Sequence, residues 1–211
     1  MRGVRCGSPA GNRVALTFDD GPSYRFTPRV LAVLRRHGVR ATFFVLGRLA
    51  RRHPELLRQI QADGHLVANH SWDHPRAGDA ELWRRQIRRT EAAIRAAGVR
   101  PAPYFRPPHG KVTPWLLRVC HELGYTIVLY TLLSSDWQRP GIAALVRQVT
   151  HRVAPGGIVV LHDAGGNRSN TLAALPAILR ALSRRYELVP LDQLLGPNPQ
   201  PMRCARPGRA R

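Results

Sequence analysis

Two hydrophobic periods alternate along most of the chain. Short apolar runs typical of β-strands are each followed by a longer stretch in which apolar residues recur on one helical face. Glycine follows several of the helical stretches, as expected at helix C-termini. The pattern predicts strands at 14–18, 41–45, 66–68, 104–105, 125–130, 157–161 and 187–189. It predicts helices at about 28–37, 54–63, 80–97, 114–123, 142–151 and 171–185.

Two threonine–proline pairs mark predicted helix starts. Thr27-Pro28 and Thr113-Pro114 each place a capping hydroxyl before a proline that suits the first helical position. Both pairs come directly before an apolar stripe with helical spacing. The sequence therefore predicts the same type of helix start at both places.

Regular alternation of strands and helices predicts parallel strands with helices packed outside. A closed barrel and an open doubly wound sheet both fit, but no G-x-G-x-x-G or Walker loop supports a nucleotide-binding open sheet. The repeating region, 12–195, is shorter than the ~250 residues typical of an eightfold barrel. We therefore expect one α/β domain, a smaller or incomplete barrel, after an N-terminal extension at 1–11 and before a disordered Arg/Pro-rich tail at 196–211.

The charge is large but evenly spread. With 33 Lys+Arg against 13 Asp+Glu, the formal net charge of +20 first suggests nucleic acid or another anionic polymer. The basic residues extend from Arg2 to Arg211 without clustering, and Lys111 is the only lysine among them. We therefore expect no specific nucleic-acid partner. No run approaches the ~18 apolar residues of a transmembrane segment.

The three cysteines have no metal-binding spacing. Cys120 lies in an apolar helical pattern and is expected to be a buried thiol. Cys6 and Cys204 lie near the two ends of the chain, which are often close in space, so we hypothesise a disulfide between them. No signal peptide is visible near the N-terminus. This leaves open whether the protein is cytoplasmic or the sequence begins after an export signal.

Ionisable residues are concentrated where predicted strands end. In parallel β/α folds the carboxyl ends of the strands build the active site, so these residues are expected to converge. They are Asp19, Asp20, Asp73, Asp136 and Asp163, with His70, His74, His109 and His162. The other histidines lie in or near helices and are expected to be structural or solvated: His37, His53, His65, His121 and His151.

Two of these histidines suggest a metal site. His70 and His74, with three residues between them, and one carboxylate make the ligand set of an open catalytic zinc site. Asp19 and Asp20, in a tight Gly-Pro turn, can divide two roles, one binding metal and the other acting as base. Asp73 is a competing ligand on spacing alone.

Five motifs, TFDDGP, HSWDH, RPPHG, SSDW and LHD, together resemble the polysaccharide deacetylase family, the NodB homology domain or carbohydrate esterase family 4. The resemblance covers residues 12–195 and implies a distorted (β/α)7 barrel. It implies a monomeric hydrolase that releases acetate from the N-acetyl groups of peptidoglycan or a chitin oligosaccharide outside the cytoplasm. The implied cofactor is zinc, with cobalt or manganese left open. An O-acetyl esterase acting on acetylxylan and an inactive cell-wall-binding barrel are the alternatives.

The resemblance also implies a role for each motif residue. Asp19 would be the catalytic base, Arg106 would hold it, and His162 would be the general acid. The metal ligands would be Asp20, His70 and His74, which makes Asp73 a non-ligand.

The remaining implied roles concern substrate and tuning. Asp136 would orient and tune the general acid, Trp137 would form a groove wall, and Leu161 would line the pocket for the acetyl methyl. The backbone N–H of His109 would stabilise the oxyanion, although the family often has tyrosine at this position. The acid that commonly precedes the Asp-Trp pair is missing from residues 133–135. Asp163 has no implied role.

Overall fold

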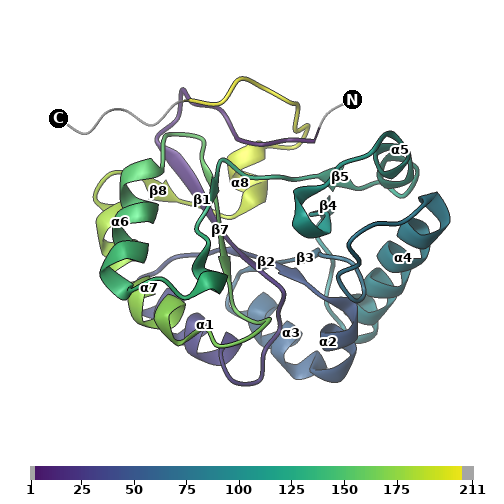
Figure 1. Ribbon diagram of the computed structural model, residues 1–211, viewed down its shortest axis with the longest axis horizontal. Helices are drawn as coiled ribbons and strands as arrows, with labels where there is room; N and C mark the ends of the chain where they lie inside the picture. Colours follow the sequence, from purple (N-terminus) through teal and green to yellow (C-terminus); the bar gives the residue numbers. More distant parts are fainter. Residues whose placement is uncertain (1–2, 206–211) are drawn as a thin grey trace.

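The computed structural model describes residues 3–205, in which helices surround one curved parallel sheet (Figure 1). The strands are β1 (Arg13–Asp19), β2 (Thr42–Val45), β3 (Leu66–Asn69), β4 (Tyr104–Phe105), β5 (Thr126–Ile127), β6 (Leu132–Leu133), β7 (Ile158–His162) and β8 (Glu187–Leu188). The helices are α1 (Thr27–Arg36), α2 (Gly47–Arg52), α3 (Pro54–Ala62), α4 (Ala80–Ala96), α5 (Pro114–Glu122), α6 (Ile142–Arg152), α7 (Ser169–Ser183) and α8 (Leu191–Leu195). Two 3₁₀ helices, η1 (Pro108–Gly110) and η2 (Asp136–Gln138), follow β4 and β6.

The sheet is a distorted barrel, as predicted. Its strand order is β5-β4-β3-β2-β1-β7-β6, and β8 pairs with the start of β1. Strands β5 and β6 are consecutive in the chain yet occupy opposite edges of this order. Only residues 128–131, here called the closing segment, connect them, so the two edges lie within about 18 Å of each other. The closing segment therefore bridges the gap in the barrel.

The closing segment corrects the strand predicted at 125–130. Within that run only Thr126 and Ile127 form a strand, β5; the next strand, β6, begins beyond the run at Leu132 and pairs with a different neighbour. Between them, Val128 forms a parallel bridge with Val4 of the N-terminal segment. The backbone N–H of Leu129 donates to the carbonyl of Val4 at 2.7 Å. A continuous apolar run carries no information about such changes of partner.

The two predicted threonine caps have different outcomes. Thr113 is confirmed, because its side chain accepts the N–H of Leu116 at 3.3 Å. The prediction for Thr27 is wrong: Phe26 occupies the cap position of α1, without a side-chain cap. The Thr27 hydroxyl is used instead by a tertiary contact with Asp163. The periodicity also missed α2 and α8, which are too short to show a helical period.

Alternation along β1 directs its side chains to opposite faces. Val14, Leu16 and Phe18 lie in the core cluster shared with the surrounding helices. Thr17 and Asp19 take the opposite face, inside the barrel, and both are buried. The fold thus places a carboxylate inside the barrel at the carboxyl end of its central strand.

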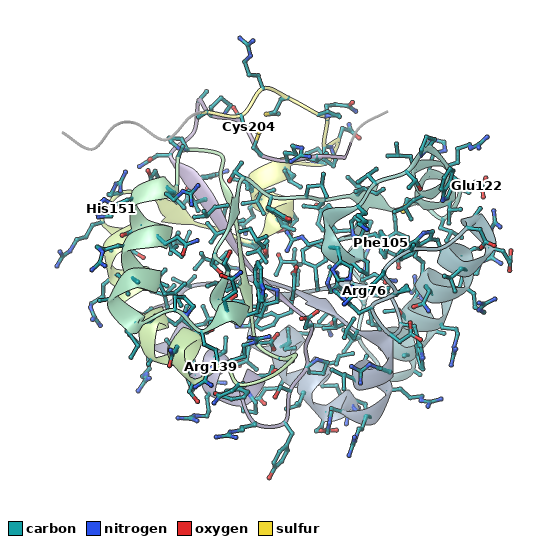
Figure 2. The ribbon with its side chains drawn as sticks, viewed as in Figure 1. Arg76, Phe105, Glu122, Arg139, His151 and Cys204 are labelled. Atoms are coloured by element: carbon teal, nitrogen blue, oxygen red, sulfur yellow. A yellow bond between two sulfur atoms is a disulfide. The ribbon has the colours of Figure 1, made fainter. Side chains whose placement is uncertain are left out.

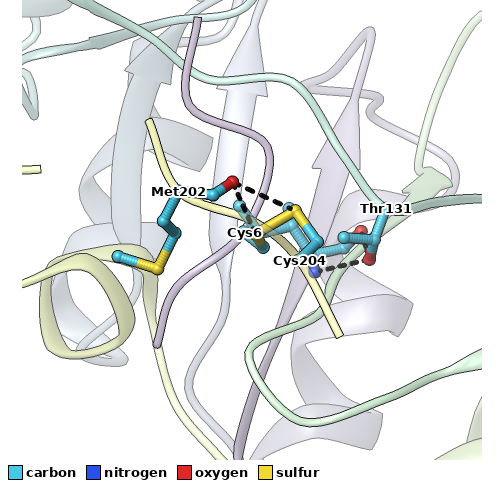
Figure 3. The surroundings of a disulfide bond; sticks show 5 residues. Cys6, Thr131, Met202 and Cys204 are labelled. Atoms are coloured by element: carbon cyan, nitrogen blue, oxygen red, sulfur yellow. Dashed lines mark hydrogen bonds between the residues drawn. A yellow bond between two sulfur atoms is a disulfide. The ribbon is translucent and has the colours of Figure 1, made fainter. Parts of the chain in front are cut away.

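The two ends of the chain are joined by the hypothesised disulfide between Cys6 and Cys204 (Figure 3). The first and last described segments run side by side at one end of the barrel (Figure 1), and the disulfide joins these two segments. Thr131 of the closing segment borders the same hollow as Cys204. Residues 197–205 contain no helix or strand, and the rest of the predicted disordered tail, 206–211, lies outside the described residues.

The other thiol behaves as expected. Cys120 is buried in α5, and this burial raises the pKa of its thiol to about 12. Within residues 3–205, no helix combines the length and the apolar character needed to cross a bilayer.

The disulfide generates a stability prediction. Replacing both cysteines, Cys6→Ser with Cys204→Ser, should lower the free energy of unfolding by about 2–5 kcal/mol, because the cross-link restricts a very long loop in the unfolded chain. Urea denaturation followed by circular dichroism measures this difference. A denaturation midpoint equal to that of the parent protein would contradict a stabilising cross-link.

Candidate active site

Asp20, His70 and His74 form a candidate cation site in which one ligand atom from each lies within 4.8 Å of the others. Asp20 Oδ1 is 3.6 Å from Nε2 of each histidine. This oxygen is buried and has no hydrogen-bond partner. Because an unpartnered buried carboxylate oxygen is costly, a cation between these three side chains would satisfy it. The donor set therefore fits a divalent metal, and the three ligands predicted from the sequence come together.

The surrounding backbone orients the His70 imidazole. His70 follows β3, and its Nδ1 donates to the carbonyl of Arg106 at 2.7 Å, which leaves Nε2 for the cation site. Burial lowers the pKa of His70 to about 3, so its imidazole is neutral at pH 7, as a metal ligand must be. Left-handed backbone occurs at Asp20 (φ 73°), Ser71 (φ 73°) and His74 (φ 65°). Such conformations in non-glycine residues are concentrated at functional sites.

Asp19 lies next to the cation site and is held by Arg106. The guanidinium Nη1 donates to Asp19 Oδ1 at 2.6 Å and to the hydroxyl of Thr17 at 2.7 Å. The other carboxylate oxygen, Oδ2, is 4.0 Å from His70 Nε2. One oxygen of Asp19 is thus occupied by the guanidinium, while the other is directed toward the cation site.

A second charged pair forms from the later strands. His162 Nδ1 bonds Asp136 Oδ1 at 2.6 Å, and the backbone N–H of His162 donates to Asp136 Oδ2 at 2.9 Å. The Thr171 hydroxyl also donates to Oδ2, at 2.8 Å. Burial raises the pKa of Asp136, but its bonds with His162 and Thr171 outweigh burial and hold that pKa below its usual value. Burial lowers the pKa of His162, and the bond and charge of Asp136 reverse this and raise it.

These groups meet in one cavity of about 440 Å³, a size typical of small-molecule sites. Its lining is Asp19, Asp20, His70, His74, His109, Gly110, Tyr130, Leu133, Trp137, His162, Gly165 and Arg168. Trp137 is 39% exposed, and its ring centre is 5.3 Å from that of His162. The ring centres of His109 and His74 are 4.6 Å apart.

Tyr130, Leu133 and Arg168 line the cavity without having been predicted. Leu133 and Tyr130 lie on or next to the unpredicted break between β5 and β6, and Arg168 follows β7 in a loop with no recognised motif. Tyr130 ends the strand predicted at 125–130 and Leu133 follows it closely, which could have indicated these two, whereas no sequence signal marked Arg168.

The structure places Leu161 elsewhere. Its side chain is fully buried in the cluster between sheet and helices and is absent from the cavity lining. Strand β7 is covered on both faces, so its sequence does not show which residues face inward. Leu133 is the leucine that reaches the cavity.

The other ionisable residues that the sequence analysis considered lie outside this cavity. Asp73 is exposed and accepts a hydrogen bond from Gln86 at 2.7 Å, outside the cation site. Asp163 is fully buried beside the β1–α1 loop, and burial raises its pKa to about 7. The His151 side chain lies at the outer surface, as does that of Glu122 (Figure 2). His65 is buried against Ala41, where its Nδ1 accepts a backbone N–H.

The fold and this site define a parallel β/α barrel in which a His-His-Asp cation site adjoins a buried carboxylate and an imidazole–carboxylate pair. The family model for polysaccharide deacetylase matches residues 7–128. The chain belongs to the polysaccharide deacetylase family.

Individual relatives support this membership. A chitooligosaccharide deacetylase from Bradyrhizobium is 39% identical, over 89% of this chain and 93% of that protein. The crystal structure of the peptidoglycan N-acetylglucosamine deacetylase Bc1960 superposes with a TM-score of 0.85 at 31% identity, covering 90% of this chain and 91% of that one. A family pseudoenzyme from Bacillus anthracis also has a TM-score of 0.85, at 28% identity, covering 91% of this chain and 68% of that one.

The Asp136–His162 pair generates a prediction. Asp136→Asn should lower the pKa of His162, because it removes the charge and weakens the bond that raise this pKa against burial. The pH titration of the His162 ring signals by NMR measures the change. Ser134→Ala serves as a control, because it removes two hydrogen bonds of Asp136, one to its side chain and one to its backbone, but keeps the charge. An unchanged His162 pKa in Asp136→Asn would contradict the coupling.

Proposed function

We propose that this protein is a metal-dependent N-deacetylase that hydrolyses the acetamido group of N-acetylglucosamine units in a polysaccharide and releases acetate. One observation carries the proposal. A carboxylate held by a buried guanidinium, a three-ligand cation site and an imidazole with a raised pKa line the same cavity. A base, an electrophile and an acid placed together in this way accelerate the hydrolysis of an amide.

Zinc is the proposed cation, because two neutral imidazoles and one carboxylate are the ligand set of open catalytic zinc sites. Bound between Asp20, His70 and His74, it would act as a Lewis acid toward the acetyl carbonyl and make a water acidic near neutral pH. Cobalt and manganese accept the same donors, so the identity of the metal is part of the test.

The base in this proposal is Asp19. Its Oδ2 would take a proton from the attacking water, while Arg106 keeps Oδ1 in place. The guanidinium is itself held in place by four further groups. It donates to the Thr17 hydroxyl and to the carbonyls of Val128 and Leu129, and it stacks on the ring of Phe44. Arg106 therefore acts as a positioning residue for the base.

The acid in this proposal is His162. Asp136 accepts its Nδ1–H, so Nε2 is left to carry the proton that the leaving amine needs. An amide nitrogen leaves poorly as an anion, and the raised pKa of His162 favours the protonated imidazole before the bond breaks. The products are acetate and a free glucosamine amine.

Substrate contacts in the proposal come from the rim of the cavity. Trp137, partly exposed beside His162, would form a wall for a sugar ring. The backbone N–H of His109, a residue with left-handed backbone (φ 59°), is the proposed hydrogen-bond donor to the oxyanion, in addition to the cation. Leu133 replaces Leu161 as the proposed apolar contact for the acetyl methyl.

The proposed substrates are peptidoglycan and chitin oligosaccharides, on which relatives of this chain are named as acting. A location outside the cytoplasm is supported by the Cys6–Cys204 disulfide, because such cross-links persist in oxidising compartments. A net charge of +20 would favour an anionic surrounding such as a bacterial wall.

Acetate release after reconstitution with zinc tests this function against its alternatives. We expect release from N-acetylglucosamine oligomers or from peptidoglycan, loss of release with a chelator, and recovery with added zinc. Release from acetylxylan alone would indicate an O-acetyl esterase. The pseudoenzyme relative shows that this fold does not guarantee activity, so zinc binding without any acetate release would indicate a binding protein.

Substitution of the base gives a sharper prediction. Asp19→Asn should lower kcat for acetate release by about 10²- to 10⁴-fold, since an amide cannot accept the proton. It should retain zinc, because Asp20, His70 and His74 remain. Zinc content by elemental analysis and acetate release measure the two properties.

The matched variant is His70→Ala, which should lose zinc and activity together because it removes a ligand. Turnover near the parent value in Asp19→Asn would show that Asp19 is not the base. Parent-like zinc content in His70→Ala would show that the cation site is wrong.

A further inference from the structure

We propose that the loop between β7 and α7, residues 163–168, is a support that fixes the metal-ligand carboxylate of Asp20, with Gly165 as its contact and Arg168 as its clamp. This inference rests on the cation site of the proposed function. The loop lies beside the β1–α1 loop that carries Asp20 (Figure 1). None of the family motifs assigns a role to Gly165 or Arg168.

Gly165 lies against the carboxylate of Asp20. Asp20 directs Oδ1 toward the two imidazoles, so Oδ2 is the oxygen on the other side of the carboxylate. A Cβ on Gly165 would lie 2.7 Å from Asp20 Oδ2, closer than real Cβ contacts come. The Gly165 backbone therefore packs directly against the carboxylate and limits its rotation.

Arg168 holds the backbone of residues 164 and 165 in place. Arg168 is 4% exposed, and its guanidinium donates to the carbonyls of Ala164 at 2.6 Å and Gly165 at 2.8 Å. Gly165 (φ +73°) and Gly166 (φ +134°) have backbone that other residues adopt with strain. The side chain of Arg168 thus holds a turn that would otherwise be free to change shape.

Asp163, at the start of the same loop, lies against Gly21, the residue after Asp20. Asp163 is fully buried, and the hydroxyl of Thr27 donates to it. A Cβ on Gly21 would lie 2.5 Å from Asp163 Oδ1, so the residue after Asp20 packs directly on this carboxylate. The two ends of Asp20, its side chain and its following peptide, are both confined by the β7–α7 loop.

The physical consequence concerns metal affinity. A free aspartate turns about its side-chain bonds and loses that freedom when it binds a cation, which weakens binding. Asp20 is confined before any cation arrives, and its left-handed backbone (φ 73°) is held by the same contacts. Residues that orient metal ligands in this way typically contribute about 10- to 100-fold in affinity.

The experiment compares two alanine variants of adjacent glycines in the full chain. Gly165→Ala adds a methyl group that collides with Asp20 Oδ2, whereas in Gly166→Ala the methyl meets only Arg168 Nη2, at 3.8 Å. Both variants introduce strain at a positive φ, and the strain is greater at Gly166 (φ +134°) than at Gly165 (φ +73°). A larger loss of zinc affinity in Gly165→Ala therefore cannot come from backbone strain. Zinc affinity is measured by competition with a chromophoric chelator, and folding is checked by circular dichroism.

We expect Gly165→Ala to bind zinc about 10- to 100-fold more weakly than the parent, and Gly166→Ala to bind close to it. The visible absorption spectrum of the Co²⁺-loaded protein should change in Gly165→Ala and remain in Gly166→Ala, because only the first displaces a ligand. Equal affinities and spectra for the parent and Gly165→Ala would overturn the inference.

A third variant keeps the test decisive if Gly165→Ala does not fold. Arg168→Met removes the clamp without adding bulk near Asp20, and should also weaken zinc binding; parent-like affinity would overturn the clamp. The parent protein separates this inference from the proposed function. If the parent does not bind zinc, the cation site itself is wrong. If the parent and Gly165→Ala bind zinc equally well, only the proposed role of the β7–α7 loop is wrong.

Discussion

The buried guanidinium of Arg106 is the interaction on which the rest of the structure depends. It is 1% exposed, and a charge in such a place is stable only when it is paired and fully hydrogen-bonded. Its partner is Asp19, at 2.6 Å, and its other donors reach the carbonyls of Val128 and Leu129, at 3.3 and 3.2 Å. The same side chain therefore fixes the catalytic carboxylate of the proposed function and the closing segment of the barrel. Its backbone carbonyl accepts from His70 Nδ1, which orients a proposed metal ligand as well.

Closure of the barrel and assembly of the site therefore depend on the same side chain. Residues 128–131 connect strands at opposite edges of the sheet, and they have no continuous strand partner of their own. They are bound instead by Arg106 inside, by Val4 of the N-terminal segment, and by Ile158, which accepts from the N–H of Thr131. The disulfide holds the N-terminal segment to the end of the chain nearby. The sequence contains 33 Lys+Arg, and the one that organises the barrel is an arginine buried beside an acid.

The sequence predicted the parts of the fold and site that depend on local pattern. Strand β1 and its neighbours were evident because parallel strands are apolar on both faces. The spacing of His70 and His74 indicated a metal site, and the resemblance to the deacetylase family selected Asp20 as their third ligand. Long-range contacts were not accessible. The hydroxyl of Thr27 looked like a helix cap and is used by Asp163, which no local pattern could show. Leu161 was placed on the wrong face because both faces of β7 are buried. The break at 128–131 begins inside the run that was predicted as one strand.

A double-mutant cycle on the free energy of unfolding tests whether Arg106 and Asp19 act as one unit. It compares Arg106→Met, Asp19→Asn and the two combined, measured by urea denaturation. Each single substitution leaves one buried partner without the other, which typically costs about 3–5 kcal/mol. We expect the combined variant to be much more stable than the sum of the two losses implies, because neither charge then remains. Losses that simply add would contradict the claim that Arg106 and Asp19 act as one unit at the centre of the barrel.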